Sequence, residues 1–156
     1  MPMPLYTPLP AWPEGARWVN GVPSLEPGGA ALLVHLWAKS CDCCKDGFPF
    51  LPAWLHAYGA AGNFRIVGIH APRTPADADV DAVEAEIERL GFAHPVWIDA
   101  EGTSLRLFRC DALPAYYLFD ADGRLRHAQI GDAGLGLLER TIRRLSTRQR
   151  EGGRES

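Results

Sequence analysis

The sequence has little of three features that each indicate a particular class of protein: cysteine, long apolar runs and excess positive charge. Four cysteines among 156 residues are too few for a disulfide framework. The longest apolar stretches span only a few residues, such as Ala30 to Val34, whereas a membrane-spanning helix needs roughly 18. The formal net charge is -3, so the basic field that nucleic-acid binding requires is missing. These shortages exclude a disulfide-dense miniprotein, a membrane span and a protein whose main partner is DNA or RNA.

The amino-terminal segment, Met1 to Pro13, lacks the parts of a secretory signal. It carries five prolines, no Lys or Arg, and no apolar stretch of the kind that forms the centre of a signal peptide. The sequence therefore predicts a cytoplasmic protein. A leader ahead of Met1 would change that prediction to an exported one.

The composition is that of an ordinary globular domain, with 47% hydrophobic and 22% charged residues. We predict a Pro-rich arm over residues 1–15, one domain over 16–146 and a flexible polar tail over 147–156. Nothing in the sequence indicates an oligomeric state.

Hydrophobic periodicity predicts an alternation of strands and helices. A short hairpin around Asn20-Gly21 is expected within Ala16 to Gly29. The predicted strands are 31–37, 64–69, 96–98, 115–119 and 125–130, and the predicted helices are 41–58, 79–90, 103–108 and 135–145. Pro49 and Pro52 must kink or restart the first helix.

This order predicts an α/β fold. Its centre is a mixed sheet in which parallel βαβ units are followed by an antiparallel hairpin, and helices flank the sheet.

Three of the four cysteines, Cys41, Cys43 and Cys44, fall within four positions between a buried strand and a helix. If Cys41 lies at the helix N-cap, the free N–H groups of the first turn favour its thiolate and lower its pKa. Cys44, one turn further on and more enclosed, can then attack a mixed disulfide formed by Cys41.

Nearby charges act in both directions on such a thiolate. Lys39 and Lys45 favour it, whereas Asp42 opposes it. The same three cysteines could instead bind Cu(I) or Zn(II), although the chain has no second C-x-x-C or H-x-x-x-H pair to close a zinc site. We assign no cofactor and no resident metal.

The segment WAKSCDCCKDGFP resembles the active site of the thioredoxin fold, with Trp37, the pair Cys41 and Cys44, and Pro49 at matching positions. Leu113-Pro114 followed by AYYLFD resembles the cis-proline loop of that fold and its next strand. Within the superfamily, the stretch from Trp18 to Leu145 looks most like the TlpA/ResA group and especially the thioredoxin-like domain of DipZ-type proteins. Further similar stretches are VGIHAP, HPVWIDAEG, LPAYYLFDADGRLRH and Ile130-Gly-Asp.

The resemblance implies a thioredoxin-like fold and a thiol-disulfide oxidoreductase that acts on protein disulfides. It makes Cys41 the nucleophile and Cys44 the resolving thiol. Pro114 shapes the surface on which the substrate backbone docks, Trp37 supports the site, and an external thiol donor regenerates the enzyme.

Two positions depart from the family pattern. His35 stands where thioredoxins carry a buried acidic residue that assists proton transfer, and a histidine could relay protons near pH 7 without a large pKa shift. The alternative is a hydrogen-bonded core histidine. Cys43 replaces a residue without sulfur, which opens the way to alternative disulfides or metal capture.

The remaining candidates are assigned structural places. His70, His94 and His127 have no spacing typical of metal ligands and are expected in the core or on the surface. Cys110 is expected to be a buried small apolar residue, with redox participation as the alternative.

Two other functions share this fold. One is a Cu(I)- or Zn(II)-binding module that uses Cys41, Cys43 and Cys44. The other is a peroxiredoxin-like antioxidant, which is disfavoured because Ala38 offers no hydroxyl to polarise a peroxide and Trp37 to Ser40 contains no proline.

Overall fold

A computed structural model describes residues 2–23 and 29–155 of the chain. Within these residues, six strands form one mixed sheet in the order β1-β4-β3-β2-β5-β6. The strands are β1 (Arg17–Val19), β2 (Ala31–Trp37), β3 (Phe64–His70), β4 (Val96–Ile98), β5 (Ala115–Phe119) and β6 (Leu125–Ile130). Strand β2 is parallel to β3, and β3 is parallel to β4, while β1, β5 and β6 each run antiparallel to a neighbour. The predicted mixed sheet is confirmed.

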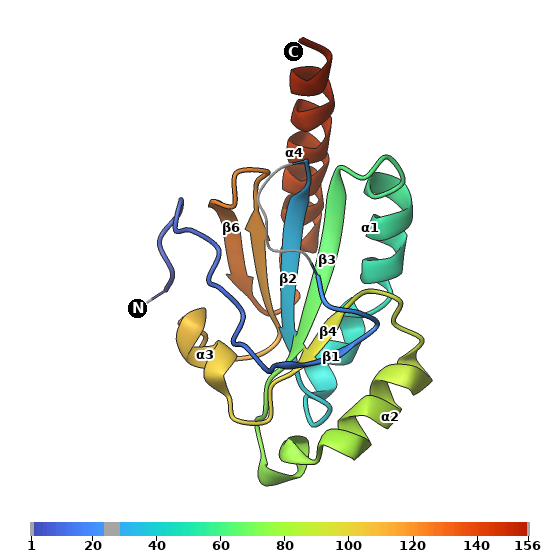
Figure 1. The fold of residues 1–156 in the computed structure, drawn as a ribbon, viewed down its shortest axis with the longest axis vertical. Coiled ribbons are helices and arrows are strands. Elements are labelled where there is room, and N and C mark those ends of the chain that lie inside the picture. Colours follow the sequence, from blue (N-terminus) through green and yellow to red (C-terminus); the bar gives the residue numbers. More distant parts are fainter. Residues whose placement is uncertain (1, 24–28, 156) are drawn as a thin grey trace.

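The helices lie on both faces of this sheet (Figure 1). They are η1 (Asp42–Gly47), α1 (Phe50–Tyr58), η2 (Pro75–Ala78), α2 (Val80–Leu90), α3 (Thr103–Leu107) and α4 (Leu135–Glu155), of which η1 and η2 are 3-10 helices. Side chains of α1, α2 and α4 pack on one face of the sheet. The other face is covered by α3 and by the amino-terminal arm.

The central strand β2 separates the two halves of the core. All seven of its residues are buried, as expected for a continuous apolar run with cover on both faces. Leu32, Val34 and Leu36 face the arm and α3, whereas Ala31 and Leu33 face α1 and α4. Because β2 ends at Trp37, the cysteine segment leaves the sheet at the carboxyl end of its most buried strand.

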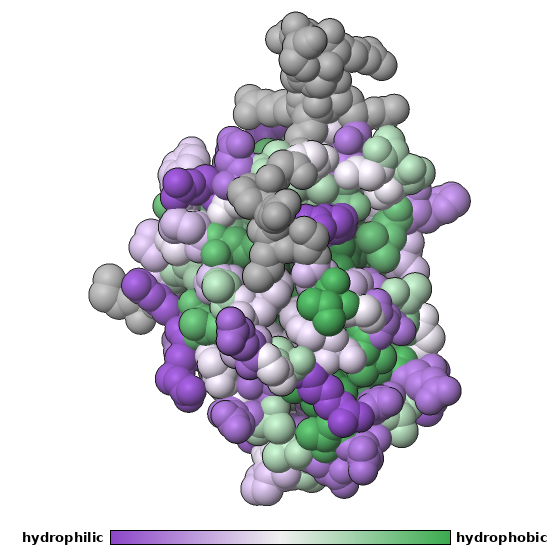
Figure 2. All heavy atoms as spheres, in the orientation of Figure 1, coloured by the Kyte–Doolittle hydropathy of each residue, from purple (hydrophilic) through white to green (hydrophobic). Residues whose placement is uncertain are grey.

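The arm crosses the sheet from one edge to the other. Pro8 bridges to Arg124, the N–H of Tyr6 donates to the carbonyl of Leu125, and the N–H of Leu125 donates to the carbonyl of Thr7. Further along, the buried ring of Trp12 lies 5.7 Å from that of Trp18. Figure 2 views this face, where apolar residues are scattered among polar ones. Among the described residues, no helix has both the length and the apolar character to cross a bilayer.

The predicted helix over residues 41–58 is instead two helices. A 3-10 helix ends at Gly47, and α1 begins at Phe50 with Pro49 as its N-cap. Pro49 has no N–H to continue a ladder, so the chain restarts there. Pro52 is tolerated because it falls in the first turn of α1, where the N–H groups have no helical partner.

The amino-terminal hairpin prediction was wrong as to pairing. Asn20 and Gly21 both have positive φ angles, 67° and 99°, as a tight turn requires, but β1 pairs with β4. The partner strand expected within 21–29 falls partly on residues 24–28, which lie outside the described residues.

The carboxyl-terminal helix is longer than predicted. It was expected to end at Leu145, and α4 continues to Glu155. The backbone of residues 147–155 is therefore helical rather than irregular. The flexibility predicted for 147–156 and the division into arm, domain and tail remain predictions, and Ser156 lies outside the described residues.

Candidate active site

Cys41 and Cys44 are joined in a disulfide, and their Cα atoms are 5.4 Å apart. Both residues are 0% exposed and pack with Trp37 and Phe48 in a cluster that also includes side chains of α2. The structure thus shows the closed, oxidised form of the predicted pair. The expectation that Cys44 is more enclosed than Cys41 was wrong for this form, because both residues are fully buried in the same apolar cluster.

Cys41 is the N-cap of η1, as the sequence predicted, although η1 is a six-residue 3-10 helix. Its N–H donates to the carbonyl of Ala38 at 3.0 Å, and its own carbonyl accepts from the N–H of Cys44 at 3.2 Å. The Cys41 side chain makes no capping hydrogen bond to η1. The expected contact between its sulfur and the first-turn N–H groups is therefore absent from the oxidised form, in which that sulfur is bonded to Cys44.

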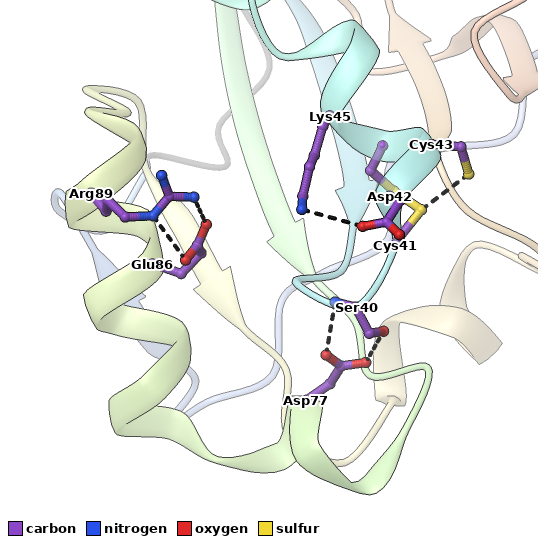
Figure 3. Close-up of polar contacts among 9 residues, drawn as sticks. Ser40, Cys41, Asp42, Cys43, Lys45, Asp77, Glu86 and Arg89 are labelled. Atoms are coloured by element: carbon purple, nitrogen blue, oxygen red, sulfur yellow. Dashed lines mark hydrogen bonds and ion pairs between the residues drawn. A yellow bond between two sulfur atoms is a disulfide. The ribbon is translucent and has the colours of Figure 1, made fainter.

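Two residues distant in sequence hold the loop that precedes Cys41. The N–H of Lys39 donates to Nε2 of His70 at 2.8 Å. The N–H and hydroxyl of Ser40 donate to the two carboxylate oxygens of Asp77, at 3.2 and 2.6 Å (Figure 3). His70 ends the neighbouring strand β3, and Asp77 belongs to η2, so the segment after that strand fixes the approach to the disulfide.

Asp77 is the centre of this anchor. Besides Ser40, its carboxylate accepts from the N–H groups of Arg73 and Thr74, at 2.8 and 3.0 Å. Burial alone raises the pKa of Asp77, but the hydrogen bonds from Ser40, Arg73 and Thr74 outweigh burial and hold the pKa below its usual value. Asp77 is therefore an ionised, buried acceptor near neutral pH.

Sequence reasoning assigned no role to either anchor, although His70, after a strand, was a residue that could approach the site. Asp77 had a local signal, because Thr74 and Asp77 form a capping box at the start of η2. His70 had no comparable signal. Its position next to the active site depends on the register that places Trp37 opposite His70, which only the sheet reveals.

The opposite end of η1 packs closely on β5. An added Cβ at Gly47 would fall on the Tyr116 hydroxyl and lie 2.9 Å from Oδ1 of Asp132. The Tyr116 hydroxyl is buried and donates to that same oxygen at 2.7 Å. Only a residue without a side chain fits this contact, so Gly47 sets how closely η1 approaches the sheet.

Cys43 is exposed, and its Sγ lies 3.3 Å from Sγ of Cys41. It also contacts the carbonyl of Leu113 at 3.7 Å, and the peptide bond between Leu113 and Pro114 is cis. Figure 3 shows Cys43 on the outer side of the turn, with its sulfur directed toward that of Cys41. The structure therefore brings the Leu113-Pro114 loop, 70 residues further along the chain, to the CxxC pair and the third cysteine.

The charged residues of η1 pair with each other. Nζ of Lys45 lies 3.2 Å from Oδ1 of Asp42, and both side chains are more than half exposed, at 53% and 94%. The expected effects of Lys45 and Asp42 on a Cys41 thiolate are opposite in sign. Since the two charges form an ion pair in water, they largely offset each other.

Trp37 supports the site from within the core. Its fully buried ring makes edge contacts with Phe48, Phe92 and His70, with ring centroids 5.3, 5.6 and 4.8 Å apart. Trp37, Phe48 and Phe92 pack in the same apolar cluster as Cys41 and Cys44. The supporting role predicted for Trp37 is consistent with its position.

His35 differs from the sequence expectation. Its ring stacks on Tyr116 at 4.9 Å, and neither ring nitrogen has a hydrogen-bond partner within the described part of the chain. Burial, with a smaller contribution from His94, lowers its pKa from 6.5 to about 3. The expectation of an unshifted pKa near 7 was wrong, and within the described residues the ring is held by stacking on Tyr116. His35 is a neutral ring in an aromatic stack.

The other histidines lie in the core or at the surface, and Cys110 is buried, as the sequence predicted. His70 and His94 are buried, and burial lowers the pKa of each to about 4, while His127 is partly exposed. Cys110 is buried, its Sγ donates to the carbonyl of Ala112 at 3.2 Å, and burial raises its pKa. A raised pKa disfavours the nucleophilic thiolate, so Cys110 is poorly suited to redox chemistry.

The structure does not favour the metal-binding alternative. Within residues 2–23 and 29–155, no three His, Cys, Asp or Glu side chains are arranged as metal ligands. Cys41 and Cys44 are bonded to each other, which leaves Cys43 as the free thiol of the group.

Comparisons with known proteins agree with this chemistry. No protein-family model matches the chain. The thiol-disulfide oxidoreductase YkuV of Bacillus subtilis is 30% identical over 145 residues, which are 92% of this chain and 97% of that protein. Protein DipZ of Mycobacterium tuberculosis is 29% identical over 117 residues, which are 75% of this chain but only 17% of DipZ.

A solved structure extends the comparison to the fold. The solution structure of a thioredoxin-like protein in its oxidised form has 30% sequence identity and a TM-score of 0.81, and the match covers 94% of this chain and 99% of that one. The similarity covers nearly the whole chain. In this chain the two cysteines of the CxxC pair form a disulfide. The chain therefore belongs to the TlpA/ResA-type thioredoxin-like family and is a thiol-disulfide oxidoreductase whose redox pair is Cys41 and Cys44.

Proposed function

We propose that Cys41 attacks the disulfide of a protein substrate and that Cys44 resolves the resulting mixed disulfide. The main observation behind this division is that Sγ of Cys41 contacts the exposed Cys43, on the side where the Leu113-Pro114 loop also lies. Cys41 is therefore the member of the pair with its sulfur next to the molecular surface. The order of the two thiols in the family motif supports the same division.

The electron balance of this reaction is simple. The Cys41 thiolate attacks one substrate sulfur, the substrate S–S bond breaks, and the other substrate sulfur leaves as a thiol after taking up a proton. The Cys44 thiolate then attacks Sγ of Cys41 and releases the second substrate thiol. The protein ends with the Cys41–Cys44 disulfide, and the substrate has gained two electrons and two protons.

Pro114 and Trp37 act as supporting residues in this proposal. The Leu113 carbonyl lies against Cys43, so the loop that ends at Pro114 borders the reacting sulfurs, and we assign it the docking of the substrate backbone. Trp37 packs beneath η1 and holds the turn in place. His35 contributes packing through its stack on Tyr116.

An external dithiol is the expected donor that reduces the closed pair again. If the protein acts in the cytoplasm, as the sequence predicts, the reducing thiol pool of that compartment makes it a reductase. A redox titration in thiol-disulfide buffers tests this direction. A strongly negative potential supports a reductase, and a high potential contradicts it.

The roles of Cys41 and Cys44 are tested by trapping, in a Cys43→Ser background so that Cys43 cannot resolve a mixed disulfide in place of Cys44. Reduced Cys43→Ser/Cys44→Ser protein should accumulate a stable mixed disulfide with a protein disulfide such as insulin. The Cys41→Ser protein should form no mixed disulfide through position 41 and should lose substrate reduction. Trapping of the substrate through Cys44 in the Cys41→Ser variant, or normal turnover of the Cys43→Ser/Cys44→Ser protein, would overturn the assignment.

A further inference from the structure

The oxidised structure presents a problem of access. Both sulfurs of the disulfide belong to residues that are 0% exposed. Reduction of a disulfide requires a thiolate to approach one of its two sulfurs directly. An external donor therefore has no open path to the closed pair.

Cys43 lies between the buried pair and the surface. Its side chain is exposed, yet its Sγ is only 3.3 Å from Sγ of Cys41, in direct sulfur-sulfur contact. It also borders a surface pocket of about 420 Å³ that is lined in part by Arg73, Leu105 and Leu113, so a small thiol has room to reach it. Exposure and contact with a reacting sulfur are two independent observations, and Cys43 combines them.

We propose that Cys43 is a third redox-active residue, which moves the disulfide from the buried pair to the surface so that a dithiol donor can reduce it. This inference rests on the proposed function, in which Cys41 and Cys44 form the closed pair, and it adds the route by which that pair is opened. It gives a catalytic role to a residue that the CxxC pattern leaves outside the redox pair.

The first step is an internal exchange. The Cys43 thiolate attacks Sγ of Cys41, a Cys41–Cys43 bond forms, and the Cys41–Cys44 bond breaks. Cys44 leaves as a thiolate and takes up the proton that Cys43 lost. One disulfide replaces another, so this step needs no oxidant or reductant.

The second step is the reduction itself. One thiolate of the donor attacks the exposed sulfur of Cys43, and Cys41 leaves as a thiolate and is protonated. The second thiol of the donor then attacks the donor sulfur of this mixed disulfide and releases Cys43. The donor becomes a disulfide, and all three protein cysteines become thiols, so two electrons and two protons pass to the protein.

The charges around Cys43 leave it open to donors of either sign. Asp42 and Lys45, its neighbours on η1, pair with each other. Arg73 and Asp111, which also line the pocket, carry opposite charges. We therefore expect dithiothreitol, a neutral dithiol, to serve as an adequate probe donor.

The test compares rates of reduction by dithiothreitol. The full chain is oxidised, mixed with the dithiol and quenched in acid, and its thiols are counted by mass after alkylation. Cys43→Ser should be reduced at least about tenfold more slowly than wild type, because the exchange step is lost. Cys110→Ala, which removes the other free cysteine, should match wild type within about twofold. Equal rates for Cys43→Ser and wild type would overturn the proposal.

A second measurement locates the free thiol directly. Oxidised protein is unfolded in acid, where exchange is slow, and labelled with N-ethylmaleimide before the disulfide is reduced and alkylated with iodoacetamide. Trypsin releases Ser40 to Lys45 as one peptide, and its fragmentation shows which cysteine carries the first label. The proposal expects the label mainly on Cys43 and partly on Cys44. Label on Cys43 alone contradicts it.

These outcomes separate the proposal from the function on which it rests. If the proposed function is wrong, Cys41→Ser still reduces insulin and Cys43→Ser/Cys44→Ser protein traps no substrate, whatever rate of reduction is measured for Cys43→Ser. If only the role of Cys43 is wrong, wild-type exchange is intact and Cys43→Ser equals it. Unchanged circular dichroism and urea unfolding of Cys43→Ser exclude misfolding as the cause of a slow rate.

Discussion

The two sides of the Cys41–Cys44 disulfide are held by different forces. On the amino-terminal side, Lys39 and Ser40 donate hydrogen bonds to buried acceptors on His70 and Asp77. On the carboxyl-terminal side, η1 is set by close packing of Gly47 against β5, and its charged residues lie in water. Hydrogen bonds hold the amino-terminal side, whereas steric packing holds the carboxyl-terminal side. This difference predicts which substitutions disturb the site most.

Removal of Asp77 should have the largest effect. In Asp77→Ala, the N–H groups of Ser40, Arg73 and Thr74 lose their shared acceptor, in hydrogen bonds that are partly buried. We expect the free energy of unfolding to fall by about 3 kcal/mol. Urea unfolding measures the change, and Asp122→Ala, at an exposed position in the turn between β5 and β6, serves as the control. A loss no greater than that of the control contradicts the anchoring role.

On the packed side, Gly47→Ala should cost about 2 kcal/mol, because the new methyl group overlaps the Tyr116 hydroxyl. Tyr116→Phe removes that hydroxyl, so the same Gly47 substitution should cost about half as much when it is made in the Tyr116→Phe variant. Gly136→Ala is the matched control, because an added Cβ there meets nothing within 4 Å. It should be neutral or stabilise the protein by about 0.5 kcal/mol. Equal costs in both backgrounds would show that the hydroxyl is not the obstacle.

The hydrogen-bonded side should also respond to pH. Burial lowers the pKa of His70 from 6.5 to about 4, although the nearby carboxylates of Asp77 and Asp99 act against burial. Between these values the unfolded chain binds the proton and the folded chain does not, so stability falls as the pH drops through this window. His70 should account for a loss of about 1 kcal/mol between about pH 7.5 and about pH 5.5.

The matched variant for this prediction is His70→Gln, which keeps an acceptor for the Lys39 N–H but does not titrate. Urea unfolding at the two pH values should show a pH-dependent loss that is smaller than wild type by about 1 kcal/mol. His35 and His94 shift in the same direction and should supply most of what remains. An unchanged pH dependence in His70→Gln would exclude His70 as a source.

The smallest effect is expected on the exposed face of η1. Lys45→Ala breaks the ion pair with Asp42, but both groups are well solvated, so stability should change by less than about 0.5 kcal/mol. High salt should reduce even that difference. A larger, salt-independent loss in urea unfolding would mean that the carboxyl-terminal side depends on charge as well as on packing.

Much of the fold could be predicted from local pattern. The sequence patterns of β4, β5 and β6 predicted these strands to the residue, because each is short, buried or alternating, and bounded by turn residues. The pairing of one strand with another cannot be predicted from such a local pattern. This is why β1 was expected in a hairpin and is instead paired with β4.

The residues of the candidate site also fall into those that local sequence predicted and those that it did not. Cys41, Cys44 and Pro114 could be identified from the sequence, because the CxxC motif and the family resemblance are both read from consecutive residues. The pKa of His35 was missed because its cause is burial by Tyr116 and Phe48, which come from other parts of the sequence. The anchors His70 and Asp77 were missed because their function depends on contact with a loop more than thirty residues upstream.

The amino-terminal arm has a consequence for association between molecules. Strand β6 is at the edge of the sheet. The N–H and carbonyl groups of an uncovered edge strand can form hydrogen bonds with a strand of another molecule. The arm occupies part of that edge, because Tyr6, Thr7 and Leu9 bond with the backbone of Gly123 and Leu125. Prolines within the arm cannot donate further hydrogen bonds, so the arm itself is a poor template for another strand. The arm therefore protects one end of β6 from intermolecular pairing.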